Sequence, residues 1–482
     1  MSFLRTTVTL PVLAATLLSG CSMAPHYSRP AQPIPASFKE APGWRAAAPS
    51  DEIAKGQWWK LFADPVLDEL EARVLVSNQN LAAAAAAYRQ ARATVSEQRA
   101  ALLPTVDLSA GATRAGTFGS GTTTINNSGG VESSNSSGSK RYTVSIGASW
   151  EPDLWGRIGS AVNQARANAE ASRADLVNAT LSAQGELALD YVQLRGLEAQ
   201  QAILDATIKA YARALTITTN RYNAGVVARV DVLQAETQLR NARGDSADLV
   251  RQRAIFEHAI AVLVGENPST FAITPAPWNR AVPEVPAVLP SALIERRPDV
   301  AAAERRVAAA NQQIGIERAA FFPTIGLSGD VGANSSKLGS LFNVASSVWS
   351  LGLTGALTLL DFGARAARVK EARAAYEQAA ATYRQTVLTA FQQTEDELSA
   401  VRVLATVGDE RVAAAAAANR VEQLTQNQYL AGILGYSDVI TAQTTALSAR
   451  RTEASAIVDR QVAAISLIQA IGGTWSEGAS AR

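Results

Sequence analysis

The spacing of apolar residues along the chain changes between a helical period and a period of two. A helical, alanine-rich pattern predicts a helix over 64–103 and another over 291–322. Pro104 and Pro323 end these two predicted helices, because proline supplies no backbone donor and clashes with the preceding turn. Each helix therefore leads directly into a segment of different character.

Strict alternation follows each of these prolines and predicts a β-hairpin over 105–151 and a second over 324–360. The alternating runs are about ten residues long, the length of a transmembrane β-strand. One face of each strand is apolar and the other is small and polar. Aromatic residues near the strand ends are typical of a membrane-interface girdle; they are Trp150, Trp155, Trp349 and Phe362. The pattern alone is equally compatible with an amphipathic hairpin packed on helices.

Long stretches without proline come after the hairpins and predict helices over 156–222 and 363–429. A helix of about 67 residues is roughly 100 Å long. The first one carries apolar residues at coiled-coil spacing, namely Leu187, Leu194, Leu197, Leu204, Ile208, Tyr211 and Leu215. Gly225 and Gly432 are predicted to stop the two helices in a left-handed C-cap.

Return helices are predicted over 231–265 and 438–471. Each is about 50 Å long, so a return helix stacked on an opening helix of about 60 Å spans about the length of one long helix. The proline-rich stretch 267–290 separates the two sets of elements and predicts an irregular connection.

The chain repeats itself. Arg221-Tyr222-Asn223-Ala224-Gly225 is echoed by Gln428-Tyr429-Leu430-Ala431-Gly432 at a separation of 207, and Leu103-Pro104-Thr105-Val106 by Phe322-Pro323-Thr324-Ile325 at 219. The difference of 12 falls in the Gly/Ser/Asn-rich segment 119–139, which we interpret as an extracellular loop. The sequence therefore predicts a duplicated structural unit. Its parts are a first structural repeat over 64–266, the connection 267–290, a second repeat over 291–472, and a C-terminal tail, 473–482.

Composition narrows the function. Of 482 residues 94 are alanine, which fits long, closely packed helices. Lys+Arg 44 against Asp+Glu 43 gives a charge of +1, and this balance argues against a nucleic-acid partner. Two histidines and one cysteine argue against a zinc site and a disulfide framework, and no group of residues suggests catalysis. We therefore expect no metal site, no cofactor and no enzymatic activity.

The N-terminus is predicted to be a lipoprotein signal peptide over 1–20. Arg5 precedes a short apolar core, and Leu18-Ser19-Gly20-Cys21 resembles a lipoprotein cleavage site. Cys21, the only cysteine, is the predicted lipid attachment site. The lipidated tail 21–63 begins with a Pro/Ala/Ser-rich part that predicts extended chain.

Four strands cannot close a barrel, and open strand edges are not tolerated in lipid. If the strands cross a membrane, several chains must share one barrel. The residues alone do not choose between two, three and four chains.

The lipoprotein signal, the two copies, Tyr-x-x-Gly followed by Asp-Val-Leu/Ile, and the run 293–301 (LIERRPDVA) together resemble the TolC family. This run and 317–323 (ERAAFFP) resemble its lipoprotein branch, the outer-membrane factors of RND-type efflux systems. The resemblance covers essentially the whole mature chain. It implies a mainly α fold with a transmembrane β part: a homotrimer with a twelve-stranded outer-membrane barrel continuous with a periplasmic α-helical barrel.

The resemblance also implies a passive duct in the outer membrane of a Gram-negative bacterium, with most of its mass in the periplasm. Its partners would be a periplasmic adaptor protein, an inner-membrane RND transporter and outer-membrane lipid. Two alternatives are a duct for type I protein secretion and a lipid-anchored coiled-coil scaffold without a pore.

A gate at the helix tips is a further implication of the resemblance. Matched by motif, its residues are Tyr429, Asp438 and Asp231, with Tyr222 from the other copy, and Gly225 and Gly432 form the tip turns where an adaptor would dock. The family's gating arginine and second aspartate fall on Leu434 and Thr441, so this chain lacks two charged groups of the family's ionic lock, and Arg229 is the candidate substitute. The alternative is that Asp231 and Asp438 only cap their helices, with Gln234 completing a loose capping box in the first.

Overall fold

A computed structural model describes residues 22–40, 57–116, 123–125, 131–133, 139–285 and 297–473. The chain divides into two compact units: one comprises Met1–Arg29, Gln90–Ala169 and Arg305–Ala380, the other Pro30–Arg89, Glu170–Glu304 and Ala381–Arg482. The predicted signal peptide, Cys21, and nearly all of the C-terminal tail lie outside the described residues. Among the helices of the described ranges, none combines the length and apolar character needed to cross a membrane.

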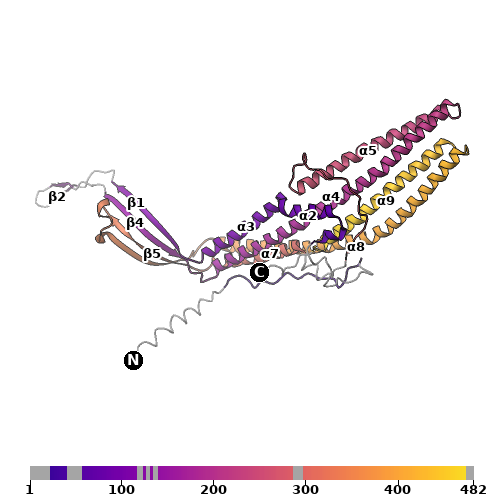
Figure 1. The fold of residues 1–482 in the computed structure, drawn as a ribbon. Helices are drawn as coiled ribbons and strands as arrows, with labels where there is room; N and C mark the ends of the chain where they lie inside the picture. Colours follow the sequence, from indigo (N-terminus) through magenta and orange to yellow (C-terminus); the bar gives the residue numbers. More distant parts are fainter. Residues whose placement is uncertain are drawn as a thin grey trace, which may run out of the picture. The chain divides into compact units, whose positions relative to one another are not determined.

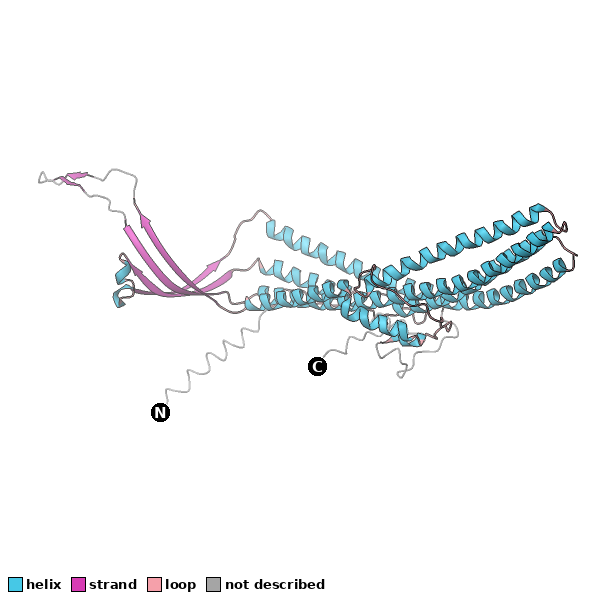
Figure 2. Ribbon diagram, turned by 45° about the horizontal axis from the view of Figure 1, so that its top comes forward, coloured by secondary structure: helices cyan, strands magenta, loops and turns pink. Residues whose placement is uncertain are grey.

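The first unit contains a curved, antiparallel sheet of four strands in the order β1-β4-β5-β6 (Figures 1 and 2). The strands are β1 (Thr105–Ala115), β4 (Ser139–Trp150), β5 (Thr324–Ser335) and β6 (Ser347–Ala356). They confirm the two predicted hairpins, and β4 pairs with β5 to join them. The short β2 (Thr123–Ile125) and β3 (Val131–Ser133) pair within the predicted loop. The prediction that the second hairpin extends to residue 360 is wrong, because β6 ends at Ala356.

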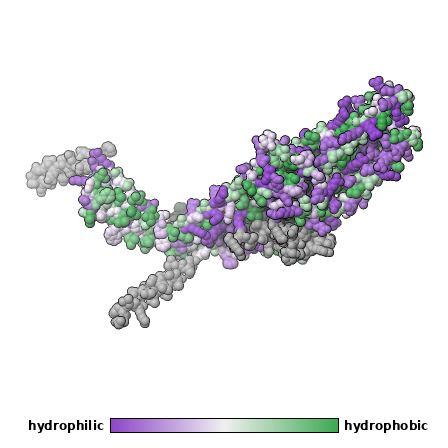
Figure 3. Space-filling model, in the orientation of Figure 1, coloured by the Kyte–Doolittle hydropathy of each residue, from purple (hydrophilic) through white to green (hydrophobic). Residues whose placement is uncertain are grey.

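The register places the large apolar side chains of all four strands on one face of the sheet. Leu108 pairs with Ile146, Ile146 with Val331, and Val331 with Trp349. These four residues are 50–80% exposed in the single chain. The other face is polar, and Thr105 Oγ1 lies 2.8 Å from Ser149 Oγ across two strands. The visible surface of the sheet is largely hydrophobic in Figure 3.

The aromatic residues near the strand ends do not all behave alike. Trp349 is 80% and Phe362 is 92% exposed, as a membrane girdle requires. Trp155 instead stacks on Phe322 with ring centroids 4.8 Å apart, and its indole N–H donates to the carbonyl of Pro323 over 2.7 Å. Trp155 therefore stabilises the turn between β4 and the next helix, and its place in a girdle stays a prediction.

The helix bounds recur at the separations found in the sequence. α3 (Gln79–Ala100) and α7 (Pro298–Ala319) each have 22 residues and are offset by 219. α4 (Arg157–Asn223) and α8 (Ala364–Leu430) each have 67 residues, offset by 207. α5 (Arg229–Leu263) and α9 (Tyr436–Ala470) each have 35 residues with the same offset of 207. The twelve-residue difference thus lies between the strands, where the Gly/Ser/Asn-rich segment is inserted.

The prediction of one continuous helix over 64–103 is wrong. The chain forms α2 (Pro65–Ser77), breaks at Asn78 and continues as α3. The Asn78 side chain accepts the backbone N–H of Leu81 over 3.1 Å and donates to the carbonyl of Leu263 over 2.8 Å. One amide therefore caps the start of α3 and the end of α5, which favours the break over a continuous helix.

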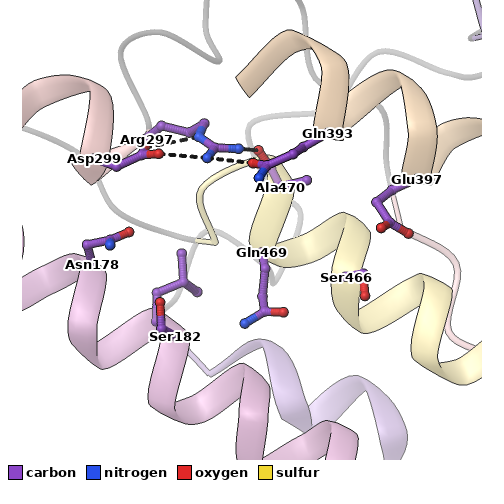
Figure 4. Close-up of a pocket in the computed structure, with 10 residues that line it drawn as sticks. Asn178, Ser182, Arg297, Asp299, Gln393, Glu397, Ser466, Gln469 and Ala470 are labelled. Atoms are coloured by element: carbon purple, nitrogen blue, oxygen red, sulfur yellow. Dashed lines mark hydrogen bonds and ion pairs between the residues drawn. The ribbon is translucent and has the colours of Figure 1, made fainter. Parts of the chain in front are cut away.

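Arg297 occupies the same position in the second copy, 219 residues after Asn78. Its guanidinium donates to the carbonyl of Ala470 over 2.9 Å, at the end of α9, and to Gln393 over 2.9 Å (Figure 4). It also forms an ion pair with Asp299 over 2.7 Å. The predicted start of the second opening helix at Ser291 lies outside the described residues, and α7 begins at Pro298.

The apolar seam predicted on the long helix is confirmed. Leu197, Leu204 and Tyr211 of α4 form a buried cluster with Leu239 and other residues of α5. Leu187 and Leu194 are fully buried. These contacts hold α4 and α5 together as an antiparallel pair.

The N-terminal segment 22–40 is extended, as its composition predicts, and it is also docked. The prediction of extended chain over the whole tail 21–63 is wrong at its end, where η2 (Trp58–Phe62) is a 3-10 helix. In the first unit, Asn311 donates to the carbonyl of Pro25 over 2.8 Å. In the second, the Glu395 carboxylate accepts the backbone N–H groups of Lys39 and Glu40 over 2.7 and 2.9 Å. The segment is therefore a strap held by side chains of α7 and α8.

A buried acid lies on α2. Glu71 is fully buried, and neither of its carboxylate oxygens has a hydrogen-bond partner. Burial, with a smaller contribution from the negative charge of Asp68, raises the pKa of Glu71 to about 9. The carboxyl is thus neutral in the folded protein at neutral pH.

We expect Glu71→Gln to stabilise the protein at pH 7 and above. When the pKa of an acid is higher in the folded than in the unfolded protein, the free energy of unfolding is unaffected below the unfolded pKa. It then falls progressively as the pH rises toward the folded value of about 9. The expected gain at pH 7 is at most about 3 kcal/mol. The measurement is the apparent melting temperature from pH 4 to 9, with the exposed Glu69→Gln as control. If the difference in melting temperature between Glu71→Gln and wild type stays constant over this range, the raised pKa of Glu71 is contradicted.

Candidate gate at the helix tips

The two helical pairs of the second unit, α4–α5 and α8–α9, end in turns of the same construction. Gly225 has φ +74 and Gly432 has φ +77, so the prediction of left-handed glycine caps is confirmed. In the first turn Val226 donates its N–H to the carbonyl of Arg221 over 2.8 Å, and in the second Ile433 donates to Gln428 over 3.0 Å. This is the six-to-one bond of a Schellman motif.

Next to these turns, side chains from both pairs form one buried cluster. It contains Ala235 of α5, Tyr429 of α8, and Tyr436 and Val439 of α9, with Leu215 of α4 packed against it. The rings of Tyr429 and Tyr436 lie 5.4 Å apart at 53°. The four helices are therefore tied together near the tips by aromatic packing.

Arg221 of α4 covers this cluster. Its guanidinium carbon lies 4.8 Å from the ring centroid of Tyr429, within the range of a cation–π contact. The hydroxyl of Tyr429 is buried and has no hydrogen-bond partner. The contact that joins the two helical pairs therefore involves the ring of Tyr429 and not its hydroxyl.

Tyr436 is neutral over the whole physiological range. Burial raises its pKa to about 12, and neighbouring groups, including Tyr429 and Asp231, add to the effect. The phenol can therefore act as a packing group and a hydrogen-bond donor, but not as an anion.

Of the two predicted gate aspartates, Asp438 caps its helix, as the alternative expects, and Asp231 does not. Asp231 is the third residue of α5, whose N-cap is Ala228, so the expectation that it caps the helix with Gln234 is wrong. Asp438 is the third residue of α9, and its carboxylate accepts the backbone N–H of Gly435 over 3.2 Å. Both acids still lie in the first helical turn, where they complement the helix dipole.

The other residues singled out from the sequence do not join the cluster. Tyr222 is 40% exposed, and Arg229, Gly225 and Gly432 are exposed. Thr441 is exposed and donates to the carbonyl of Ser437 over 3.0 Å, while Leu434 is half-buried. Within the described ranges, the ion pairs of the tip region include neither Asp231 nor Asp438.

Tyr436, a member of the cluster, and Arg221, which covers it, were not predicted as gate residues. Tyr436 and Arg221 reach Tyr429 through tertiary packing of α9 and α4, and no short motif marks such a contact. Arg221 did stand in the repeated motif, but its counterpart in the second copy is Gln428. That difference between the copies was the one available signal.

Comparison with known proteins gives a consistent result. The family model described as outer membrane efflux protein matches residues 71–266 and 289–473. Outer membrane protein OprJ of Pseudomonas aeruginosa is 31% identical over 97% of this chain and 96% of that protein. The solvent efflux pump outer membrane protein SrpC of Pseudomonas putida is 30% identical over 97% and 98%. The open-state structure of the Neisseria gonorrhoeae MtrE outer membrane channel aligns with a TM-score of 0.82 at 29% identity, covering 94% of this chain and 98% of that one.

Proposed function

The chain belongs to the outer membrane efflux protein family, and we propose that three copies of it form a passive duct that ends in a gate at the helix tips. It is the outer-membrane channel component of an efflux system and resides in the outer membrane of a Gram-negative bacterium. The family consists of channels and not of enzymes. The relatives are named for efflux, which favours that role over type I secretion or a scaffold without a pore.

The open edges of the sheet support the proposal that several chains form one barrel together. In the part of the chain that the structure describes, its outer strands, β1 and β6, each pair on one side only. An apolar face with unpaired edges is unstable in lipid unless further strands close it. Three copies supply twelve strands, an even number in the range of bacterial barrels. The mass of the detergent-solubilised complex tests this: three chains are expected, and a stable monomer contradicts it.

We propose that the tips are also where a periplasmic adaptor docks, and that the adaptor links the duct to an inner-membrane RND transporter. Support comes from exposed apolar side chains in and beside the turns. Val226 is 62%, Leu430 57% and Ile433 70% exposed. Single exposed apolar residues are common, but several in and beside the two turns mark a contact surface.

We propose that Cys21 carries the lipid anchor. The strap begins at Ser22 and is held along α7 and α8, so a lipid on the preceding residue would be attached to an anchored segment. We expect Cys21→Ala to abolish the mass increment of the lipid in intact-mass spectrometry. If the Cys21→Ala protein carries the same lipid mass increment as wild type, Cys21 is not the attachment site.

For the gate, we propose that the closed tip is held by the contact of Arg221 with the Tyr429 ring. A cation–π contact with a half-buried arginine contributes about 1–2 kcal/mol. We expect Arg221→Ala to increase the open population about 5- to 30-fold, measured as open probability in planar bilayers.

Two matched variants sharpen this test. Tyr429→Phe keeps the ring and removes a hydroxyl without a partner, so it should behave as wild type. Arg213→Ala removes an exposed arginine from the same helix and should also have no effect. The proposal fails if Arg221→Ala conducts like wild type, or if Tyr429→Phe opens the channel as much as Arg221→Ala does.

A further inference from the structure

We propose that the outward face of the sheet carries a binding site for phosphorylated lipid of the outer leaflet, formed by Arg114, Lys140 and Lys337. The inference rests on the proposed function, which puts the helices in the periplasm and the loop ends of the strands at the cell surface.

The register brings the three cations to one place. Arg114 of β1 and Lys140 of β4 are direct cross-strand partners. Tyr142 of β4 partners Ser335, the last residue of β5, and Lys337 follows two residues later. The backbone N–H of Lys337 donates to Ser335 Oγ over 3.2 Å, which holds the turn against the strand end. The site is therefore contributed by β1, β4 and the turn after β5.

Strand alternation places Arg114 and Lys140 on the apolar face. Arg114 has the same parity as Val106 and Leu108, and Lys140 the same as Tyr142 and Ile146. Arg141, between Lys140 and Tyr142, points to the opposite, polar face. The cations thus continue the lipid-facing rows and do not line the pore.

Their height on the strand matches the headgroup level. From Trp150 to Tyr142, every outward residue of β4 is apolar or aromatic, and Lys140 is the next. This run of outward residues spans about 20 Å along the membrane normal for a strand tilted by about 40°. Tyr142 then lies at the interface, and Lys140 just beyond it. In Figure 3, hydrophilic residues gather at this end of β1 and β4.

The charges need a counter-ion. Like charges directly opposite each other on antiparallel strands are destabilising. All three side chains belong to exposed residues, and in the described ranges no carboxylate forms an ion pair with any of them. The outward neighbours Ala112 and Tyr142 are uncharged. A phosphate group provides the missing negative charge and accepts hydrogen bonds from arginine and lysine.

The occupant we commit to is lipid, because the site continues an apolar, lipid-facing surface. A lipid can contact both parts of this surface, with its acyl chains along Ile146 and Val144 and its phosphate at Lys140. Lipid A, a phosphorylated outer-leaflet lipid, has this chemistry. Free inorganic phosphate uses only the cations.

The test is a titration of the full-length, detergent-solubilised protein with lipid A, followed by native mass spectrometry. We expect the triple variant R114Q/K140Q/K337Q to bind at least about tenfold more weakly than wild type, since three cations at an anionic surface are lost. R141Q, on the opposite face of the same strand, is the matched control and should bind like wild type. R114K/K140R/K337R should retain binding, which separates charge from folding. Dephosphorylated lipid A should bind equally well to wild type and to the triple variant.

Equal binding of lipid A by the triple variant and wild type overturns the site. So does competition by inorganic phosphate at the same concentration as lipid A, which would show a general anion site. Conductance in phosphatidylcholine bilayers separates the site from the duct. A triple variant that conducts but binds lipid A normally refutes only the site, whereas a wild-type protein that binds lipid A through these residues but never conducts refutes only the duct.

Discussion

Arg297→Ala is expected to lower the free energy of unfolding by about 3–5 kcal/mol, because it removes the donor from a buried junction. The arginine is 8% exposed, donates hydrogen bonds to Ala470 and Gln393, and forms an ion pair with Asp299 (Figure 4). Its loss leaves the last carbonyl of α9 with only the 3.4 Å contact from Thr394 and leaves Asp299 without its cation. We expect lower midpoints in both thermal and guanidinium unfolding of the detergent-solubilised protein.

Arg240→Ala provides the comparison for this variant. Arg240 pairs with Glu236 on α5 over 3.3 Å, but its side chain is 68% exposed. An exposed pair of this kind contributes at most about 0.5 kcal/mol. If Arg297→Ala is no more destabilising than Arg240→Ala, the arginine does not hold the junction of α7, α8 and α9.

Gly265→Ala has the second large expected effect. Gly265 follows the end of α5 with φ +73, and a Cβ there would lie 2.3 Å from the carbonyl oxygen of Ser77. The substitution therefore adds a backbone clash to the strain of a left-handed residue. We expect a loss of at least about 3 kcal/mol, seen as a lower unfolding midpoint, because Ser77 precedes the break that Asn78 caps.

Gly225→Ala separates the two contributions. Its φ is +74, but nothing lies within 4 Å of the added Cβ. Only the conformational strain remains, about 1–2 kcal/mol. Similar losses for the two alanine variants would show that the contact of Gly265 with Ser77 has no energetic role.

The regular elements were accessible from sequence because local rules dominate them. Gly225 and Gly432 determine the ends of α4 and α8 through their left-handed conformation, and strict alternation defines β1 and β5. The break at Asn78 was missed because helix propensity favours continuity there. Its cause is a tertiary bond to Leu263, which is distant in sequence.

The tip cluster shows the same limit. The motif Tyr-x-x-Gly identified Tyr429, but the partners Arg221 and Tyr436 depend on how α4 and α9 pack against α8. The prediction that Asp231 caps its helix failed because α5 begins two residues earlier than expected, at Arg229. A cap assignment depends on single-residue accuracy at a helix end, which periodicity does not provide.

The most direct test of the central claim is the current carried by the purified, full-length protein in planar lipid bilayers. The account predicts discrete conductance steps from a heat-labile assembly of three chains, with a higher open probability for Arg221→Ala. An assembled, folded protein that inserts without any conductance would contradict the claim that the chain forms an outer-membrane duct.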